Sequence, residues 1–330
     1  MQGIPTFFGI TVIAFLIMMA APGDPITLIT FSPRRDPASI ESMKRQLGLD
    51  QPIVTQYIYW LVGNNWAKVD SNSEGAIYGT RLGLLRGDLG ESIKYKQPVT
   101  KLILERIPAT LLLTFTALII GYGAGIALGL LSAVYHKTWI DEVIRIVTVI
   151  GNAVPAFWLG LILIIVFSTK LDILPAGGMR DITSRGDVTI SETVIHMIMP
   201  VFVLSLGTIA FVSRFMRTEL LEVLTQDYIR TARSKGLANN IVWWKHAARN
   251  ALIPVATFVG PALGTLLSGA VIIEQVFDWP GMGRLVVNAV FQRDYPLVMG
   301  SVVVASLLFI MGVILSDIFY GLLDPRIRFR

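Results

Sequence analysis

The sequence predicts an all-α polytopic membrane protein with six transmembrane helices. Its 330 residues are 53% hydrophobic and only 15% charged, whereas an ordinary soluble domain has about 25% charged residues. The mean hydropathy of +0.63 agrees with a membrane composition. Six apolar runs are each long enough to cross a bilayer, which takes about 20 residues. The chain is therefore divided into membrane spans and not into soluble domains.

The six apolar runs place the spans in order along the chain. The first helix, within residues 1–21, has its apolar run from Ile4 to Ala21 and ends at "APGDP", without a charged segment before it or a small-residue cleavage site after it. We interpret it as a retained helix and not as a signal peptide. The other five spans are predicted within a core of residues 108–322, at 108–134, 143–169, 194–215, 252–276 and 296–322.

Lysine and arginine in the short loops predict the orientation, because these residues are retained on the cytoplasmic side of a membrane. About twelve of them lie in 135–145, 214–250 and 323–330, against about five in 170–192 and 277–295. Both termini, including the tail 323–330, and the loop 214–250 are then predicted to be cytoplasmic. The long segment 22–107 is predicted to face outward.

Residues 22–107 are predicted to form a small extracytoplasmic subdomain between the first two spans. From Ala38 to Gly63 apolar and charged residues alternate at helical spacing, as in a pair of surface helices. Residues 63–83 are rich in glycine, asparagine and serine, which predicts an irregular loop without a core of its own. On composition alone this loop is a passive surface segment.

The sequence argues against an enzyme. It has no cysteine, which excludes disulfides and thiolate catalysis, and its three scattered histidines do not predict a metal site. It contains no G-x-x-x-x-G-K-[ST], G-x-S-x-G or H-E-x-x-H motif, so neither ATP hydrolysis nor hydrolase chemistry is expected. No catalytic residue, metal ligand or cofactor is predicted in this chain.

Two other functions that charge suggests are also disfavoured. The net charge of +5 is explained by topology, and no basic face alternates with stacking aromatics as in a nucleic-acid-binding surface. The acidic residues nearest the membrane are Asp24, Glu274 and Asp317, which lie toward span ends. A proton relay usually has its ionisable groups at mid-membrane depth.

Two spans carry features that predict close packing or a break. Gly121, Gly125 and Gly129 recur every four residues in the second span, which predicts a face where another helix backbone approaches closely. In "IGNAVPAFWLG" the third span contains Asn152 and Pro155, which either line a cavity or form an ordinary kink. Together with Phe157, these residues are the candidates for the translocation path.

The stretch "DYIRTARSKGL" at 227–237 predicts a short capped helix in the cytoplasmic loop 214–250. Asp227 suits the N-cap, Lys235 the last turn and Gly236 the position after the helix. A helix of about eight residues follows. Its apolar edge consists of Tyr228, Ile229 and Ala232, and its cations are Arg230, Arg233 and Lys235. Such a helix binds either anionic lipid headgroups or a protein partner.

Ten motifs in order give the chain a resemblance to a known family over nearly its whole length. They are "PGDP" at 22–25, "LGLDQP" at 47–52, "GDLGES" at 87–92, "ERIPATLLL" at 105–113, "PAFWLGL" at 155–161, "DYIRTARSKGL" at 227–237, "HAARNALIP" at 246–254, "FDWPGMGRL" at 277–285, "FQRDYPLVMG" at 291–300 and "DPRIRF" at 324–329. With them the chain resembles the inner-membrane permease subunits of binding-protein-dependent ABC importers, in the dipeptide/oligopeptide/nickel branch.

The resemblance implies a type I ABC importer permease fold with a coupling helix. In that family a cytoplasmic E-A-A-x-x-x-G signature forms a helix that docks on the ATPase subunit. Arg230, Thr231 and Ala232 occupy the E-A-A positions here, and Gly236 is the glycine. Only the second alanine and the glycine agree with the general signature, which resembles the peptide-importer branch. The implied coupling residues are Asp227, Tyr228, Ile229, Arg230, Thr231, Ala232, Arg233, Ser234, Lys235, Gly236 and Leu237.

The resemblance also implies partners and a substrate class. The expected complex holds a homologous second permease, two ATP-binding cassette subunits that bind ATP and Mg, and an extracytoplasmic solute-binding protein, in the inner membrane of a prokaryotic cell. Peptides are the expected substrate; oligosaccharides and nickel chelates are alternatives, as is a stand-alone secondary transporter or a membrane scaffold. In this setting Trp66, Tyr78 and Arg81 of the loop 63–83 are candidate contacts to the binding protein.

Overall fold

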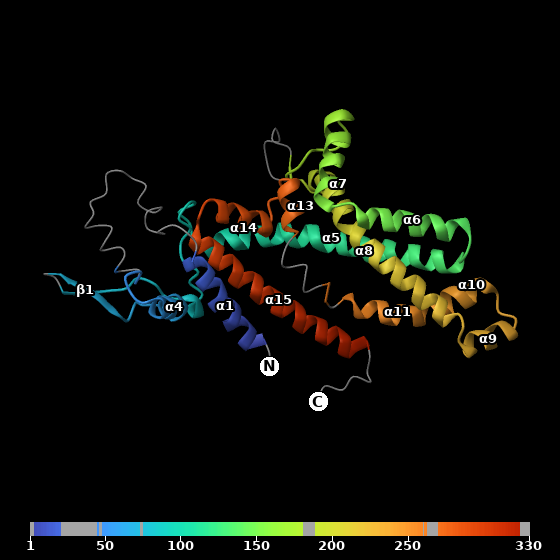
Figure 1. The fold of residues 1–330 in the computed structure, drawn as a ribbon, viewed down its shortest axis with the longest axis horizontal. Helices are drawn as coiled ribbons and strands as arrows, with labels where there is room; N and C mark the ends of the chain where they lie inside the picture. Colours follow the sequence, from blue (N-terminus) through green and yellow to red (C-terminus); the bar gives the residue numbers. More distant parts are fainter. Residues whose placement is uncertain are drawn as a thin grey trace. The chain divides into compact units, whose positions relative to one another are not determined.

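The computed structural model describes residues 3–20, 45, 48–72, 75–180, 189–259, 261–262 and 270–323. The regular secondary structure of this part is helical apart from one β-hairpin and an isolated bridge between Glu91 and Pro98 (Figure 1). It forms two compact units, one of Met1–Ile107 with Leu285–Leu307 and the other of Pro108–Arg284 with Leu308–Arg330. The predicted all-α class is confirmed, with the hairpin as its exception.

The first unit combines the helix α1 (Gly3–Ala20) and the starts of α5 (Val99–Val134) and α15 (Tyr295–Leu323) with the short elements that lie between α1 and α5 in the sequence. Its other elements are α4 (Ile53–Val62), β1 (Lys68–Asn72), β2 (Gly75–Tyr78), the 3₁₀ turn η1 (Leu84–Arg86) and most of α14 (Met282–Phe291). Aromatic packing joins α1 to α4, where the Phe15 ring lies 5.4 Å from that of Tyr57. The helix predicted before α4 lies almost wholly outside the described residues.

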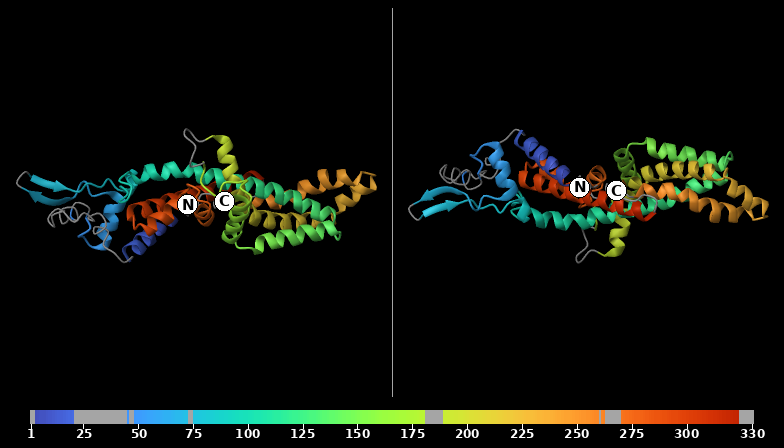
Figure 2. Two further views of the ribbon diagram at one scale, coloured as in Figure 1. Left: turned by 90° about the horizontal axis from the view of Figure 1, so that it is seen from above. Right: turned by 90° about the horizontal axis from the view of Figure 1, so that it is seen from below.

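The loop predicted at 63–83 is in fact built around an antiparallel hairpin, which extends away from α4 (Figures 1 and 2). Lys68 pairs with Tyr78 and Asn72 with Gly75. The composition was misleading because the glycines here allow close backbone approach. A Cβ on Gly79 would lie 2.2 Å from the buried Asn64 side chain, and one on Gly83 would lie 2.2 Å from the backbone nitrogen of Gly63.

The second unit is a helical bundle around α5 and α8. Its other elements are α6 (Trp139–Ala153), α7 (Ala156–Leu163), the π-helical η2 (Ile164–Lys170), α8 (Ile190–Val223), α9 (Asp227–Ser234), α10 (Asn239–Ile241), the π-helical η3 (Val242–Ala247), α11 (Ala248–Thr257) and α13 (Val271–Val276). Both α6 and α11 pack along α8, and α13 packs on α7 and α8. A capping box formed by Thr189 and Glu192 begins α8.

The glycine face predicted in the second span is confirmed by the contacts of α5 with α8. A Cβ on Gly121 would lie 2.7 Å from Thr208 Cβ, and one on Gly125 would lie 2.7 Å from Val212 Cβ. At Gly129 the nearest atom would be the Ser213 carbonyl oxygen, at 2.6 Å. Any larger residue at these positions would force the two helices apart, so α5 and α8 form one tightly packed pair.

The described helices account for most of the predicted spans. Four are long and apolar enough to cross a membrane, namely α1, α5, α8 and Tyr295–Leu315 of α15, and α6 with the following segment Ala156–Lys170 makes a fifth if the bent pair is one span. The remaining predicted span, 252–276, falls partly on residues outside the described ranges. Several helices are longer than the predicted spans: α5 already begins at Val99 and continues through Pro108, and α8 extends from Ile190 to Val223. Proline is tolerated within transmembrane helices.

Candidate functional site

The candidate site is the short helix α9 and the part of the second unit that supports it. Its N-cap is Gln226, and Asp227, predicted as the cap, lies in the first turn. At the other end Gly236 has φ of +75°, its N–H donates to the Arg233 carbonyl, and the Leu237 N–H donates to that of Ala232. This is a Schellman motif, which confirms the glycine predicted after the helix.

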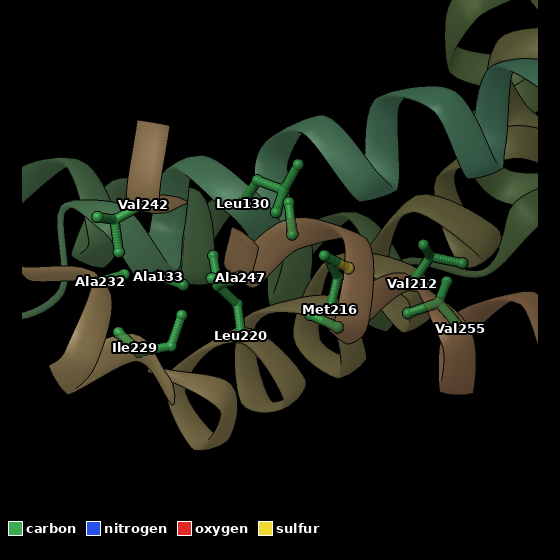
Figure 3. Packing of buried hydrophobic residues seen from close by; sticks show 12 residues of the cluster. Leu130, Ala133, Val212, Met216, Leu220, Ile229, Ala232, Val242, Ala247 and Val255 are labelled. Atoms are coloured by element: carbon green, nitrogen blue, oxygen red, sulfur yellow. The ribbon is translucent and has the colours of Figure 1, made fainter. Parts of the chain in front are cut away.

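One edge of α9 is fixed in the core of the bundle. Ile229 is fully buried and Ala232 is 8% exposed. Their side chains point toward those of η3, α5 and α8 (Figure 3). Tyr228, predicted on the same edge, is 42% exposed, and its hydroxyl accepts a 2.6 Å hydrogen bond from the Asn250 amide. The apolar edge is thus narrower than predicted, with Tyr228 on its rim.

The opposite side of α9 is basic and exposed. Arg230, Arg233 and Lys235 are all exposed, and Arg230 forms an ion pair with Asp227 at 3.4 Å within the same helix. The hydroxyls of Thr231 and Ser234 donate to backbone carbonyls one turn earlier, at 3.0 Å each. Because both hydroxyls already donate within the helix, the groups that the outer face offers to a partner are mainly its cations.

A buried ion pair that sequence reasoning missed stiffens the same end of the bundle. Asp141 in α6 is 2% exposed and accepts two hydrogen bonds from Arg217 in α8, at 2.8 and 2.7 Å. The Ser132 hydroxyl of α5 also donates to it, at 2.6 Å. Bidentate pairs of this kind fix geometry as well as adding energy. Three helices are thereby tied together beside the core that holds α9.

The three candidate path residues lie together at the break between α6 and α7. The two helices meet at an angle of 97°, far sharper than an ordinary kink. Asn152, Pro155 and Phe157 are all exposed in the isolated chain. A Cβ on Gly207, midway along α8, would lie 3.9 Å from Asn152 Oδ1. Asn152 therefore lies beside the middle of α8, and its place in a translocation path stays a prediction.

The three candidate contacts to a binding protein all lie near the base of the hairpin but differ in exposure. Trp66 and Tyr78, at the base of the hairpin, are 58% and 52% exposed. Arg81 is only partly exposed and lies on the wall of a cavity of about 720 Å³ within the first unit. Burial lowers the pKa of its guanidinium, and the charge of Asp88 opposes that shift. Arg81 thus supports the hairpin base while the two aromatic residues face outward.

Comparison with known families identifies the chain. Residues 125–329 match the family described as binding-protein-dependent transport system inner membrane component, and residues 2–114 match the N-terminal model of such membrane components. The chain belongs to this family. It is an ABC importer permease, a transmembrane component without the ATP-hydrolysing part. Among the described residues of the permease, no group of three or more histidine, aspartate and glutamate side chains is placed to hold a metal ion.

Several curated relatives match the permease over its full length. It is 41% identical over 330 residues to the oligopeptide transport system permease protein AppB of Bacillus subtilis (strain 168), covering 100% of this chain and 97% of the relative. It is 36% identical to the di/tripeptide transport system permease protein DppB of Pseudomonas aeruginosa (strain UCBPP-PA14), covering 98% and 96%. It is 37% identical to the glutathione transport system permease protein GsiC of Escherichia coli (strain K12), covering 99% and 96%.

Solved structures support the fold alone. A chain of the MetNI methionine ABC transporter in an inward-facing conformation aligns with a TM-score of 0.54 and 17% identity, covering 68% of the permease and 97% of that chain. A chain of an amino acid ABC transporter solved with histidines aligns with a TM-score of 0.51 and 17% identity, covering 67% and 94%. Both are ABC transporter chains, so the fold class agrees with the family.

Proposed function

We propose that this permease belongs to an ATP-driven importer of peptides and forms half of its translocation path. Relatives at 41% and 36% identity over the full length are named as oligopeptide and di/tripeptide permeases, which supports a peptide substrate. Oligosaccharides and nickel chelates are the alternative substrates, and a stand-alone secondary transporter the alternative class. None of the relatives described above is named for these.

The proposed complex contains a homologous second permease, two ATP-binding cassette subunits and an extracytoplasmic solute-binding protein, with no nucleic acid. The ATPase subunits bind ATP and Mg²⁺, because this chain has no P-loop of its own. The permease crosses the prokaryotic inner membrane with both termini in the cytoplasm, as its lysine and arginine distribution indicates. In this orientation α9 faces the ATPases, and the subdomain 22–107 faces the binding protein.

The observation that carries the coupling role is the two-sided geometry of α9. Ile229 anchors one edge in the bundle core, while Arg230 and Arg233 face outward from the other. A close-packed core transmits a displacement instead of absorbing it. We infer that the outer cations meet acidic or polar groups in a cleft of the ATPase, and that the buried edge passes the movement to α5, α8 and α11.

The proposed cycle is alternating access. ATP binding closes the two ATPase subunits against each other, and α9 transmits the closure to the spans, which opens the path toward the docked binding protein. ATP hydrolysis returns the path to its inward-open form. Asn152, Pro155 and Phe157, at the sharp bend between α6 and α7, line this path. Their exposure in the isolated chain fits a surface that faces the second permease or the substrate.

The hairpin is proposed to contact the solute-binding protein. Trp66 and Tyr78 are large, exposed aromatic side chains of the kind enriched in protein interfaces. Arg81 holds the base of the hairpin, where its backbone N–H donates to Asn64 Oδ1 at 3.0 Å. The hairpin would reach the docked protein near its ligand cleft and assist release of the substrate.

The coupling proposal is tested by reversing charge on α9. The double variant Arg230→Glu with Arg233→Glu should abolish transport and the ATPase activity stimulated by the binding protein, because two attractive contacts become repulsive. Membrane insertion should persist, since both side chains are exposed. The measurements are substrate uptake and ATP hydrolysis by the complete transporter in proteoliposomes.

A matched control makes the same change of charge elsewhere at the same end of the bundle. Lys137 and Arg145 are exposed and lie before and within α6, so Lys137→Glu with Arg145→Glu should leave most of the transport intact. Normal transport by the α9 variant would remove the coupling assignment. Equal losses in both double variants would instead indicate a general effect of charge.

A further inference from the structure

Glu274 is a fully buried carboxylate in the second unit, and the coupling role of α9 makes no use of it. It lies in α13, and its two carboxylate oxygens have different partners. Oε1 accepts a 2.8 Å hydrogen bond from the Thr110 hydroxyl of α5. Oε2 accepts a 3.0 Å hydrogen bond from the backbone N–H of Arg284. One side chain thus joins α13, α5 and the segment 277–284, which consists of the turn after α13 and the first residues of α14 and is called the turn 277–284 below.

The same turn is attached to α5 by two further hydrogen bonds. The Thr110 hydroxyl, while donating to Glu274, accepts from the backbone N–H of Met282 at 2.7 Å. The indole N–H of Trp279, which is fully buried, donates to the Ala109 carbonyl at 2.9 Å. Adjacent residues of α5 therefore hold both the middle and the end of the turn.

The backbone of the turn approaches α13 so closely at two glycines that a side chain there would collide with it. A Cβ on Gly281 would lie 2.4 Å from the Glu274 carboxylate, and one on Gly283 would lie 2.7 Å from Val271 Cα and 3.0 Å from Glu274 Oε2. The glycines of the "FDWPGMGRL" motif are thereby explained by close approach to Glu274 and Val271 of α13 and not by an unusual φ angle. The turn is packed directly against α13 at this carboxylate.

The α5–α8 pair connects this joint to the core that holds α9. Near the joint, Trp279 belongs to a buried cluster with Leu113 of α5 and Val201 of α8. Near α9, Ile229 belongs to a cluster with Leu130 of α5 and Leu220 of α8. From Thr110 to Ala133 the helix α5 covers about 35 Å at 1.5 Å per residue. The glycine face of α5 packs the two helices together between these points. The turn at 277–284 and the helix α9 thus lie toward opposite ends of one closely packed pair of helices (Figure 1).

A buried carboxylate is a costly way to join helices if stability alone is required. The hydrogen bonds of Glu274 come from a hydroxyl and a backbone N–H, and the nearby Arg284 guanidinium instead pairs with Asp278. Well-packed apolar residues of similar volume often stabilise a fold as well or better. A carboxylate differs from them by fixing the positions of its donors, which specifies one arrangement of the turn.

We propose that Glu274 is a positioning residue for transport, whose carboxylate holds the turn 277–284 to α5 so that this turn moves with the α5–α8 pair. The inference rests on the proposed coupling by α9, which supplies the movement at the other end of the pair. With the joint intact, displacement of α9 reaches the turn. With the joint loosened, the ATPases still close and hydrolyse ATP, but the turn no longer follows.

The experiment compares Thr110→Val with Thr110→Ser in the complete transporter in proteoliposomes. Valine keeps the shape of threonine but removes the hydroxyl, whereas serine keeps the hydroxyl. In Thr110→Val the substrate carried per ATP hydrolysed should fall by about tenfold or more, since a hydrogen bond to a charged group is lost. ATP hydrolysis stimulated by the binding protein should stay within about twofold of normal, and Thr110→Ser should resemble the unchanged protein.

Glu274→Gln provides a second variant. Its side chain keeps the size of glutamate, but one carboxylate oxygen becomes an NH₂ group, which cannot accept the hydrogen bond of the Thr110 hydroxyl or the Arg284 N–H. It should lower the same ratio of transport to hydrolysis while the complex assembles normally. An unchanged ratio in both Thr110→Val and Glu274→Gln would overturn the proposal. So would a parallel loss of transport, hydrolysis and assembly, because that pattern indicates a structural role only. Failure of the α9 assignment is distinguished by the charge-reversal variants, which leave this joint intact.

Discussion

At the scale of single residues, Gly236 shows how one position sets the direction of the chain after α9. Its φ of +75° belongs to the left-handed region, and its N–H donates to the Arg233 carbonyl at 2.9 Å. Glycine adopts this conformation without the penalty that a Cβ brings. The chain therefore turns back toward η3 directly after Ser234, and α9 stays short.

Two substitutions at Gly236 should reduce transport to different degrees. Alanine should cost about 1–2 kcal/mol in the left-handed region, and transport should fall only partly. Proline should abolish transport and stimulated ATP hydrolysis, because its φ near −65° and its missing N–H are both incompatible with the turn. Membrane insertion should persist in both variants. Substrate uptake and the amount of permease in the membrane fraction are the measurements, and full transport by Gly236→Pro would contradict the role given to this turn.

At the scale of elements, the hairpin β1–β2 is the largest departure from the structure that the sequence predicts. Its residues are polar and small, a composition typical of irregular loops. The hairpin is held at its base by Asn64, whose side-chain oxygen accepts from Arg81 N–H, and by the close approach of Gly63 to Gly83. These contacts join residues about twenty positions apart, beyond the range of local patterns.

Deletion of Asn65–Thr80 tests whether the hairpin has a role in transport. If it contacts the solute-binding protein, the deletion should reduce uptake at limiting binding protein by about tenfold or more, as expected when an aromatic hot spot is lost. Basal ATP hydrolysis should be unchanged. The double variant Trp66→Ala with Tyr78→Ala should reproduce much of the effect without shortening the chain. Unchanged uptake after the deletion would leave the hairpin as a passive surface element.

At the scale of the whole molecule, the chain has the features expected of a subunit that transmits movement and not of one that hydrolyses ATP. It has no P-loop, and its described part presents a basic helix, a stiff pair of helices and a buried joint. Such a part requires partners that supply energy and substrate. The family and the full-length relatives agree with a permease subunit of an ATP-driven transporter.

The substrate class is predicted for the intact complex and not for this chain alone. Because the relatives at 41% and 36% identity are named as peptide permeases, the complete transporter with its binding protein should co-purify with short peptides. Mass spectrometry of the released ligand is the measurement. A nickel chelate or an oligosaccharide in place of peptides would contradict the substrate assignment while leaving the permease fold and the α9 role untouched.

The sequence by itself determined the features that depend on residues close together in the chain. Apolar runs predicted the long helices, and the glycine after "RTARSK" predicted where α9 ends, because periodicity and capping act over a few residues. Even there, the cap was placed one residue late, at Asp227 instead of Gln226.

Only the tertiary structure decided which distant groups meet. Asp141 finds Arg217 across 76 positions, and Glu274 finds Thr110 across 164. No short sequence pattern predicts either pair, because the partner of a buried charge is set by how the helices pack and not by the neighbouring residues in the chain. Burial makes each such partner obligatory, since an unpaired charge in the core is costly. The helices are thus encoded locally, whereas the joints that would let them act together exist only in the folded molecule.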